Sequence, residues 1–231
     1  MVEAARAAGG LLAVSEGLKR DMTGLGIPAD KVKVHYTGID LDRFLPLDRA
    51  REKARLGIEG PLIVTPGALI ERKGQKLAIE ALARLPDATL LMAGDGPDRK
   101  ALERQAQKLG VAGRARFLGS RPHEEMPRLL AAADVMLLPS RSEGLANVWV
   151  EALACGTPVV TCQAGSAGEA IDRPAAGRMV EREPGELAAA VRALLATPPA
   201  QDEVRKAALR FSWQRNSEEL AAHLRAVALG G

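Results

Sequence analysis

The chain has 231 residues, of which 47% are hydrophobic and 26% are charged, a composition typical of globular proteins. Its 32 basic and 29 acidic residues are spread without a dense basic block, which argues against nucleic acid as a partner. The 2 cysteines are too few for a disulfide framework, and we expect both to be small buried side chains. No secretory leader pattern opens the sequence and no apolar run is long enough to span a bilayer, so we expect a cytoplasmic protein.

Apolar runs typical of buried strands alternate with amphipathic segments typical of helices along most of the chain. The predicted strands are 11–15, 32–36, 62–66, 89–94, 115–119, 134–139 and 158–162. The predicted helices are 15–25, 73–85, 98–110, 146–155 and 212–228. Strands that alternate with helices favour parallel pairing and right-handed crossovers. The sequence therefore predicts the α/β class, with a Rossmann-like parallel sheet covered by helices on both faces.

The alternation changes character before residue 61, which predicts two parts of unequal size. Residues 39–57, "IDLDRFLPLDRAREKARLG", form a charged stretch that contains proline and has the composition of a connector. We therefore predict a small part at 1–45 and a main domain at 46–231.

Ligands of parallel sheets bind at the carboxyl ends of the strands, so the loops after the predicted strands are the places to look for chemistry. In "GALIERKGQ", residues 67–75, Gly67 allows close approach of the backbone, and Arg72 and Lys73 place positive charge at a helix start that suits phosphate. Solvated basic side chains at a turn are the alternative. The segment "GDGPDRKALE" at 94–103 opens like a dinucleotide fingerprint, but Arg99 stands at the third glycine position, which argues against a nicotinamide cofactor.

The stretch "SEGLANVWVEALACGTPVV", residues 142–160, carries two glutamates at the start of an apolar helix. Glu143 lies in the loop before the helix and Glu151 lies about one turn inside it. We expect Asn147 or Ser142 to cap this helix, and a favourable charge near the helix start is the alternative explanation of Glu151. Carboxylates accept hydrogen bonds from paired sugar hydroxyls, and a helix N-terminus holds phosphate. Together these features favour a nucleotide sugar as the ligand.

The segments "ALIERKGQKLAIEAL" and 90–161 resemble the C-terminal domain of the retaining glycosyltransferases with the GT-B architecture, called group 1 or family 4. The resemblance is strongest from Leu62 to Thr161, and Glu143 and Glu151 match the family's Glu-x7-Glu signature. It implies that 1–45 is a remnant of the N-terminal acceptor domain with its hinge, that 46–231 is the nucleotide-sugar-binding domain, and that helix 212–228 returns toward the N-terminal domain.

The resemblance also implies a role for each matching residue. Glu143 would contact the donor sugar near the reacting centre, Glu151 would accept the ribose hydroxyls, and Lys73 would neutralise the diphosphate leaving group with help from Arg72. Glu143 and Lys73 are thus the implied catalytic residues. The remaining implied donor contacts are Gly67, Gly144, Leu145, Ala146 and Asn147 around the sugar and phosphates, and Pro122 and Met126 near the base.

Two departures from the family pattern stand out. Ala68 occupies a position where the family often has an arginine, which leaves the phosphate charge to Arg72 and Lys73. The segment "AGSAGEAI" replaces a Gly-Gly-x-Pro-Glu motif and keeps only its glutamate, Glu169. His123 is expected to be a capping or solvated side chain and not a general base.

The expected activity is hexosyl transfer from a UDP-, GDP- or ADP-sugar with retention at the anomeric carbon, without a metal or another cofactor, in polysaccharide or glycolipid synthesis. The expected acceptor is a sugar or a lipid-linked molecule, with peripheral contact at the inner face of the membrane. We expect little transfer by these 231 residues alone, because the family's acceptor pocket lies in the N-terminal domain. We also expect self-association through residues 1–45 and the last helix. The alternatives are a related sugar-nucleotide epimerase and a non-catalytic nucleotide-sugar-binding module.

Overall fold

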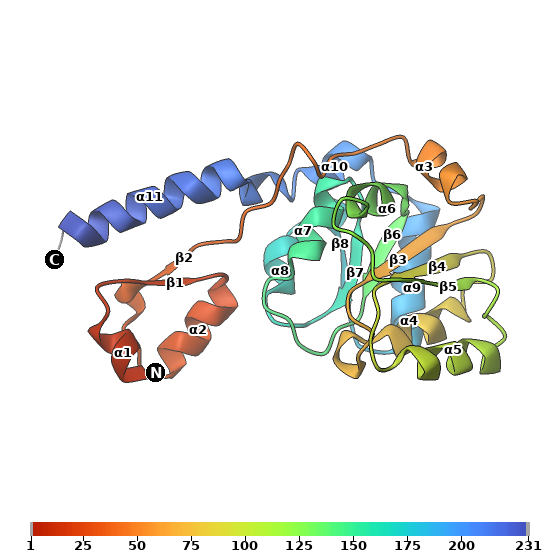
Figure 1. The fold of residues 1–231 in the computed structure, drawn as a ribbon, viewed down its shortest axis with the longest axis horizontal. Coiled ribbons are helices and arrows are strands. Elements are labelled where there is room, and N and C mark those ends of the chain that lie inside the picture. The colour runs from red at the N-terminus through yellow and green to blue at the C-terminus, as the bar shows by residue number, and fades with distance from the viewer. Residues whose placement is uncertain (1, 230–231) are drawn as a thin grey trace.

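The computed structural model describes residues 2–229 and contains two parallel sheets, one large and one small (Figure 1). The large sheet has six strands in the order β5-β4-β3-β6-β7-β8. The strands are β3 (Leu62–Pro66), β4 (Thr89–Ala93), β5 (Ala115–Gly119), β6 (Val135–Leu138), β7 (Val159–Cys162) and β8 (Gly177–Val180). The sequence predicted the first five within a residue or two. It missed β8, a short edge strand whose residues Arg178 and Met179 are exposed.

Helices cover both faces of the large sheet, as predicted. One face packs against α4 (Gln75–Leu82), α5 (Arg99–Lys108) and α9 (Pro184–Ala196). The other packs against α6 (Met126–Ala132), α7 (Asn147–Ala154), α8 (Ala167–Ala170) and α10 (Gln201–Arg205). Side chains alternate between the two cores along each strand, so Leu62 and Val64 of β3 enter one core and Ile63 enters the other. Short 3-10 turns connect several elements, namely η2 (Glu71–Lys73), η3 (Pro174–Ala176) and η4 (Leu209–Phe211).

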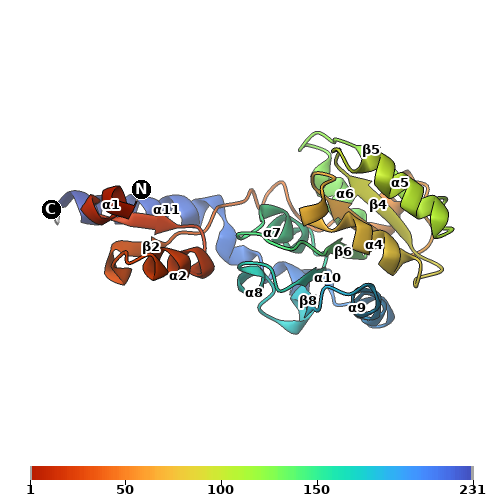
Figure 2. The same ribbon diagram turned by 90° about the horizontal axis from the view of Figure 1, so that it is seen from below.

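The small sheet belongs to a second, smaller region, which we call the annex: residues 2–36 together with the last helix, α11 (Trp213–Leu229). Its elements are α1 (Val2–Ala7), β1 (Leu11–Ala13), α2 (Glu16–Gly24), η1 (Ala29–Lys31) and β2 (Val32–Val34). The buried side chains that form its core are Ala13, Ile27 and Val32. Figure 2 shows α11 lying alongside α1 and the small sheet, away from the large sheet. The remaining residues, 37–212, form the larger unit.

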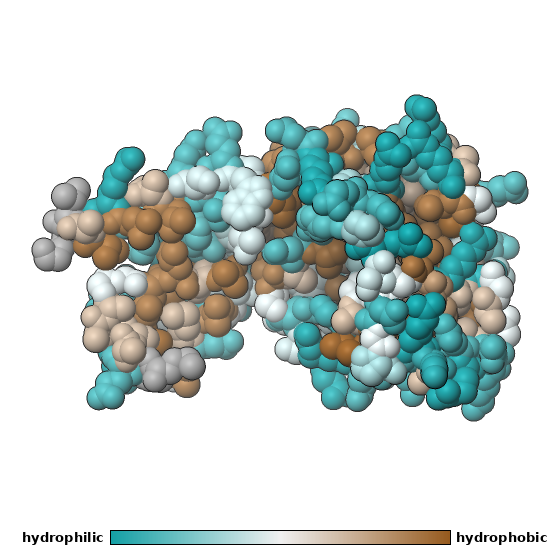
Figure 3. All heavy atoms as spheres, viewed as in Figure 1, coloured by the Kyte–Doolittle hydropathy of each residue, from teal (hydrophilic) through white to brown (hydrophobic). Residues whose placement is uncertain are grey.

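Part of the annex surface is apolar, and Figure 3 shows hydrophobic side chains gathered over α11 and the elements below it. The exposed large apolar residues of this region are Leu12, Val14, Leu18, Leu25, Trp213 and Leu224. Self-association through residues 1–45 and the last helix, which the sequence predicts, stays a prediction. Within residues 2–229, no helix combines the length and the apolarity required to cross a bilayer.

Two chain segments connect the annex with the larger unit, and they pair where they cross. The Ile39 amide donates to the Phe211 carbonyl (2.7 Å) and the Trp213 amide donates to the Ile39 carbonyl (3.1 Å). Ile39 and Phe44 are buried in the core of the larger unit, so by packing this unit begins before residue 39, whereas the sequence predicted a division at 45. The connector predicted at 39–57 also contains a helix, α3 (Arg49–Arg55), capped by the side chain of Asp48.

A carboxylate of the larger unit also binds the annex. Glu169, on α8, accepts hydrogen bonds from the amides of Glu16 (2.9 Å) and Gly17 (3.2 Å) at the start of α2, and from the Tyr36 hydroxyl (2.9 Å). Burial works to raise the pKa of Glu169, but the donated hydrogen bonds outweigh it and hold the pKa below its ordinary value. Burial and the Glu169 hydrogen bond raise the pKa of Tyr36 to about 12. The junction therefore depends on a charged acceptor at a helix N-terminus.

Candidate functional site

The strand order defines a switch point between β3 and β6, the two central strands of the large sheet. From β3 the chain proceeds to β4 and β5 on one side, and from β6 it proceeds to β7 and β8 on the other. The loops after β3 and β6 therefore lie at the usual ligand position in such sheets. The two loops touch at Gly74, whose φ is +78° and where a Cβ atom would lie 2.3 Å from the Pro139 carbonyl oxygen. Only glycine permits this contact.

Several hydrogen bonds fix the loop after β3. The Gly67 amide donates to the Ala93 carbonyl (2.9 Å), and the Gln75 side chain donates to the Ala68 carbonyl (2.9 Å). The Arg141 amide donates to the Arg72 carbonyl (2.8 Å), which ties this loop to the loop after β6. As a result η2 presents its basic side chains at the switch point.

Three of the predicted site residues meet there. Lys73 Nζ lies 2.6 Å from Glu143 Oε1, and Arg72 Nη1 lies 3.7 Å from Glu143 Oε2. The Glu143 side chain is only 9% exposed and that of Lys73 is 17% exposed, so solvent screens their interaction less than at an open surface. Two cations face one carboxylate, which leaves this cluster with an excess positive charge suited to an anion.

The helix α7 begins beside this cluster. Its N-cap is Ala146, and no side chain caps it within the described chain, so the prediction that Asn147 or Ser142 caps the helix is wrong. Asn147 is instead the first helical residue, and the Ser142 carbonyl accepts a hydrogen bond from Arg72 (2.6 Å). The uncapped N-terminus leaves backbone N–H groups and the positive end of the helix dipole beside Lys73. Gly144 is exposed before it, and Leu145 packs against the core.

Glu151, the second glutamate, lies about one turn inside α7 and belongs to a separate cluster. Glu151 Oε1 lies 3.1 Å from His123 Nε2, and the Glu151 side chain is 12% exposed. Both residues and Asn147 line a cavity of about 300 Å³, whose opposite wall consists of residues 37–40, Arg43, Phe44 and Trp213. The structure thus places Glu143 with the basic loop and Glu151 with a histidine.

Pro122 and Met126, the two residues predicted near the base, differ in their exposure to solvent. Pro122 is exposed in the loop between β5 and α6, next to His123. Met126 is 9% exposed and its side chain belongs to the core beneath α6, so only its backbone is left to contact a ligand. The pairing of His123 with Glu151 was not predicted from the sequence. The position of His123 in the loop that follows β5 was the available signal, because that loop also opens at the carboxyl end of the sheet.

The two cysteines are buried, as predicted. Burial raises the pKa of Cys155 to about 12 and that of Cys162 to about 11, which keeps both thiols protonated and unreactive at neutral pH. Among residues 2–229, no three His, Cys, Asp or Glu side chains cluster in a way that would hold a metal ion.

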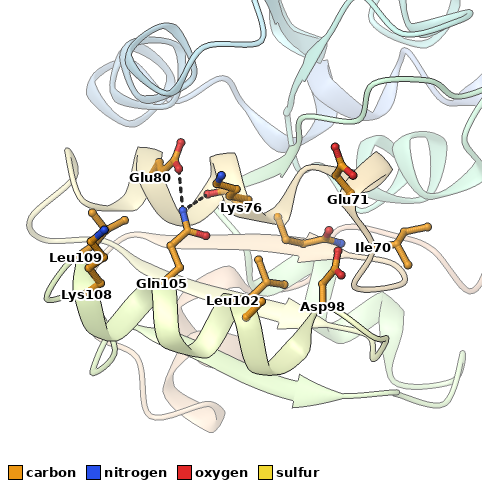
Figure 4. Close-up of a pocket in the computed structure, with 11 residues that line it drawn as sticks. Ile70, Glu71, Lys76, Glu80, Asp98, Leu102, Gln105, Lys108 and Leu109 are labelled. Atoms are coloured by element: carbon orange, nitrogen blue, oxygen red, sulfur yellow. Dashed lines mark hydrogen bonds between the residues drawn. The ribbon is translucent and has the colours of Figure 1, made fainter.

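A different hollow of about 460 Å³ lies between α4 and α5 (Figure 4). The Gln105 amide group bridges the two helices through Glu80 (2.8 Å) and the Lys76 carbonyl (3.3 Å). None of the predicted site residues lines it; its walls include residues of α4 and α5 together with Ile70, Glu71 and Asp98.

Comparison with known proteins gives one family. Residues 48–211 match the family described as glycosyl transferases group 1. A GDP-mannose-dependent alpha-(1-6)-phosphatidylinositol monomannoside mannosyltransferase of Mycolicibacterium smegmatis is 39% identical over 176 residues, which cover 70% of this chain and 46% of that protein. A D-inositol 3-phosphate glycosyltransferase of Mycobacterium bovis is 33% identical over 215 residues, or 87% of this chain and 45% of that protein. The chain thus spans about half the length of these curated relatives.

Solved structures agree with this match. The Anabaena protein HepE in complex with UDP superposes with a TM-score of 0.90 at 28% identity, covering 97% of this chain and 66% of HepE. Its complex with UDP-glucose superposes with a TM-score of 0.85 at 29% identity and the same coverage. The chain therefore belongs to the glycosyl transferases group 1 family, and it carries the Rossmann-like parallel sheet of the GT-B glycosyltransferases.

Proposed function

We propose that this chain is the donor-binding part of a retaining, family 4 glycosyltransferase, which moves a hexosyl group from a nucleoside diphosphate sugar to an acceptor. The observation that carries the proposal is the Lys73–Glu143 contact of 2.6 Å at the switch point of the sheet. The UDP and UDP-glucose in the HepE complexes support a nucleotide sugar as the ligand class. The name of the Mycolicibacterium relative makes GDP the second nucleotide to test.

In this proposal the diphosphate lies between Lys73 and the N-terminus of α7, with Arg72 at the solvent side and the Gly67 backbone beneath it. The bond between the anomeric carbon and the diphosphate oxygen breaks, and its electron pair stays on that oxygen. An acceptor hydroxyl oxygen forms the new bond to the anomeric carbon, and its proton passes to the released diphosphate. Lys73 and the amides of α7 stabilise the charge that develops there, because they are already oriented toward it. Fixed cations and a helix N-terminus thereby supply the stabilisation without a metal.

The two glutamates take different parts of the donor. Glu143, beside Lys73, accepts the hydroxyls of the transferred sugar, with the backbone of residues 144–147 around it. Glu151, one turn deeper in α7, accepts the ribose hydroxyls. The base then lies toward Pro122 and the backbone of Met126.

We further propose that the acceptor is a sugar or a lipid-linked molecule of polysaccharide or glycolipid synthesis. In the family the acceptor pocket belongs to the N-terminal domain. We therefore expect residues 1–231 alone to bind donor nucleotide and to show little or no transfer, and appreciable transfer by them would contradict this part of the proposal.

Calorimetric titration with UDP and GDP tests donor binding. We expect at least one nucleotide to bind, and we expect Lys73→Ala to weaken it about 10- to 100-fold, since a charge-assisted hydrogen bond is lost. Lys76→Ala is the matched control, because Lys76 is an exposed lysine three residues away that lines the α4–α5 hollow. Equal affinities of the wild type and Lys73→Ala for both nucleotides, or no binding at all, would overturn the proposal.

A further inference from the structure

His123 is the one side chain in residues 2–229 whose recorded hydrogen bond reaches the Glu151 carboxylate. The carboxylate cannot donate, so the 3.1 Å contact requires that the imidazole carries a proton on Nε2. The bond occupies one acceptor position of Oε1. The second acceptor position of Oε1 and both positions of Oε2 are left for a ligand.

The histidine is itself held in place from two directions. In the loop between β5 and α6 the Glu125 amide donates to the Pro122 carbonyl (3.0 Å) and the Met126 amide donates to the His123 carbonyl (3.3 Å), which fixes the backbone on both sides of the ring. The ring packs at 54° against the buried Phe44, with 5.3 Å between the ring centres. The His123 side chain is 57% exposed, but these contacts give it a defined orientation.

We infer that His123 is a positioning residue for ribose recognition: its Nε2–H orients the Glu151 carboxylate so that the carboxylate accepts both ribose hydroxyls of the donor nucleotide. The inference rests on the proposed function, which assigns the ribose to Glu151. A glutamate side chain has three rotatable bonds, and a carboxylate held by a second group loses less freedom when the diol binds. The histidine therefore contributes affinity through Glu151, without being required to touch the nucleotide.

If His123 positions Glu151, its substitution should affect nucleotides that carry ribose hydroxyls more than nucleotides that lack them. His123→Ala should weaken UDP or GDP binding about 5- to 10-fold, because the hydrogen bond to the charged partner is lost. The same substitution should change the affinity for the 2′,3′-dideoxy form of that nucleotide by less than about twofold, since the form lacks both hydroxyls. His123→Gln places an amide N–H near the position of Nε2 and should restore ribonucleotide binding to within about threefold of the wild type.

A double-mutant cycle completes the experiment. In a Glu151→Ala background, His123→Ala should cost less than about twofold in ribonucleotide affinity, because the carboxylate that His123 orients is already gone. His223→Ala, on α11, controls for the loss of an imidazole elsewhere. Circular dichroism melts of each variant show that it is folded.

The outcomes distinguish this inference from the proposed function. Failure of the wild type to bind either nucleotide removes the proposed function and the inference with it. Wild-type binding that His123→Ala weakens equally for the ribose and dideoxy forms overturns the inference alone, as does a Gln variant no better than the Ala variant. A loss of affinity in His123→Ala that is confined to the ribonucleotide, together with its recovery in His123→Gln, supports the inference.

Discussion

The larger unit and the annex use the same elements, parallel strands and helices, with different results. In the larger unit six strands are covered on both faces, and two cores of buried side chains result. In the annex two strands meet three helices, and the buried core is Ala13, Ile27 and Val32. Two strands bury too little apolar surface for independent stability, whereas six strands covered by helices bury a complete core. The site residues discussed above are therefore carried by the more stable region.

The two regions also differ in how they are held. Apolar packing fixes β3 and β6, the strands that carry the switch-point loops, because both strands are entirely buried. A hydrogen-bonded carboxylate, Glu169, fixes the start of α2 in the annex. The first kind of stabilisation depends little on pH, and the second depends on the ionisation of one group.

The chain has one tryptophan in each region, which permits a direct comparison of stabilities. Trp149 of α7 is 0% exposed, whereas Trp213 at the start of α11 is 52% exposed. We expect Trp149→Ala to lower the free energy of unfolding by about 3–5 kcal/mol, the usual cost of removing a large buried aromatic side chain. Trp213→Ala, the matched control, should cost less than about 1 kcal/mol. Urea denaturation followed by far-UV circular dichroism measures both, and equal losses would mean that the two regions do not differ as described.

Acid should release the annex while the larger unit stays folded. The folded-state pKa of Glu169 is lowered, so its contribution to stability is complete above the ordinary carboxyl range and is lost as the pH falls through the folded-state pKa. Because the group is partly exposed, the loss should be on the order of 1 kcal/mol. In NMR spectra the Glu16 and Gly17 amide signals should move together as the pH is lowered from about 7 to about 3.

Glu169→Gln is the control for this titration. Its neutral side chain cannot ionise, so the same two amides should already be displaced at neutral pH and should show no acid step of their own from this residue. If the wild type and the variant titrate identically, Glu169 does not hold the annex.

The parts of the fold that the sequence predicted are those with strong local patterns. The buried strand "LIVTP" and the helix that Gly110 ends are defined by residues close together in the chain. The strand β8 was missed because its exposed edge position weakens the apolar pattern, and α3 was missed because its seven residues are mostly charged. Periodicity detects a helix or strand by its buried face, so elements with little buried surface, such as β8 and α3, escape it. The helices α6 and α9 were also not predicted, although both bury several residues.

In the site, too, local patterns were predicted from the sequence and contacts between distant residues were not. Glu143 and Lys73 were predicted from a signature and a loop, and the structure brings their side chains into contact. The pairing of His123 with Glu151 joins residues 28 positions apart, and the hydrogen bond from the Glu16 amide to Glu169 joins residues 153 positions apart. Such contacts follow from the order of strands in the sheet, which residue patterns alone do not specify. The helix cap was predicted wrongly because Asn147 has a capping side chain but lies one residue too late.

The central claim is that a nucleoside diphosphate binds at the switch point between β3 and β6. Amide chemical-shift mapping during a titration with UDP or GDP tests it most directly, since it reports the bound position without assuming it. The largest shifts should fall in residues 67–74 and 143–151 and in the loop that carries His123. If the largest shifts instead fall along α4 and α5, around Lys76 and Gln105, the nucleotide binds in the other hollow and not at the switch point.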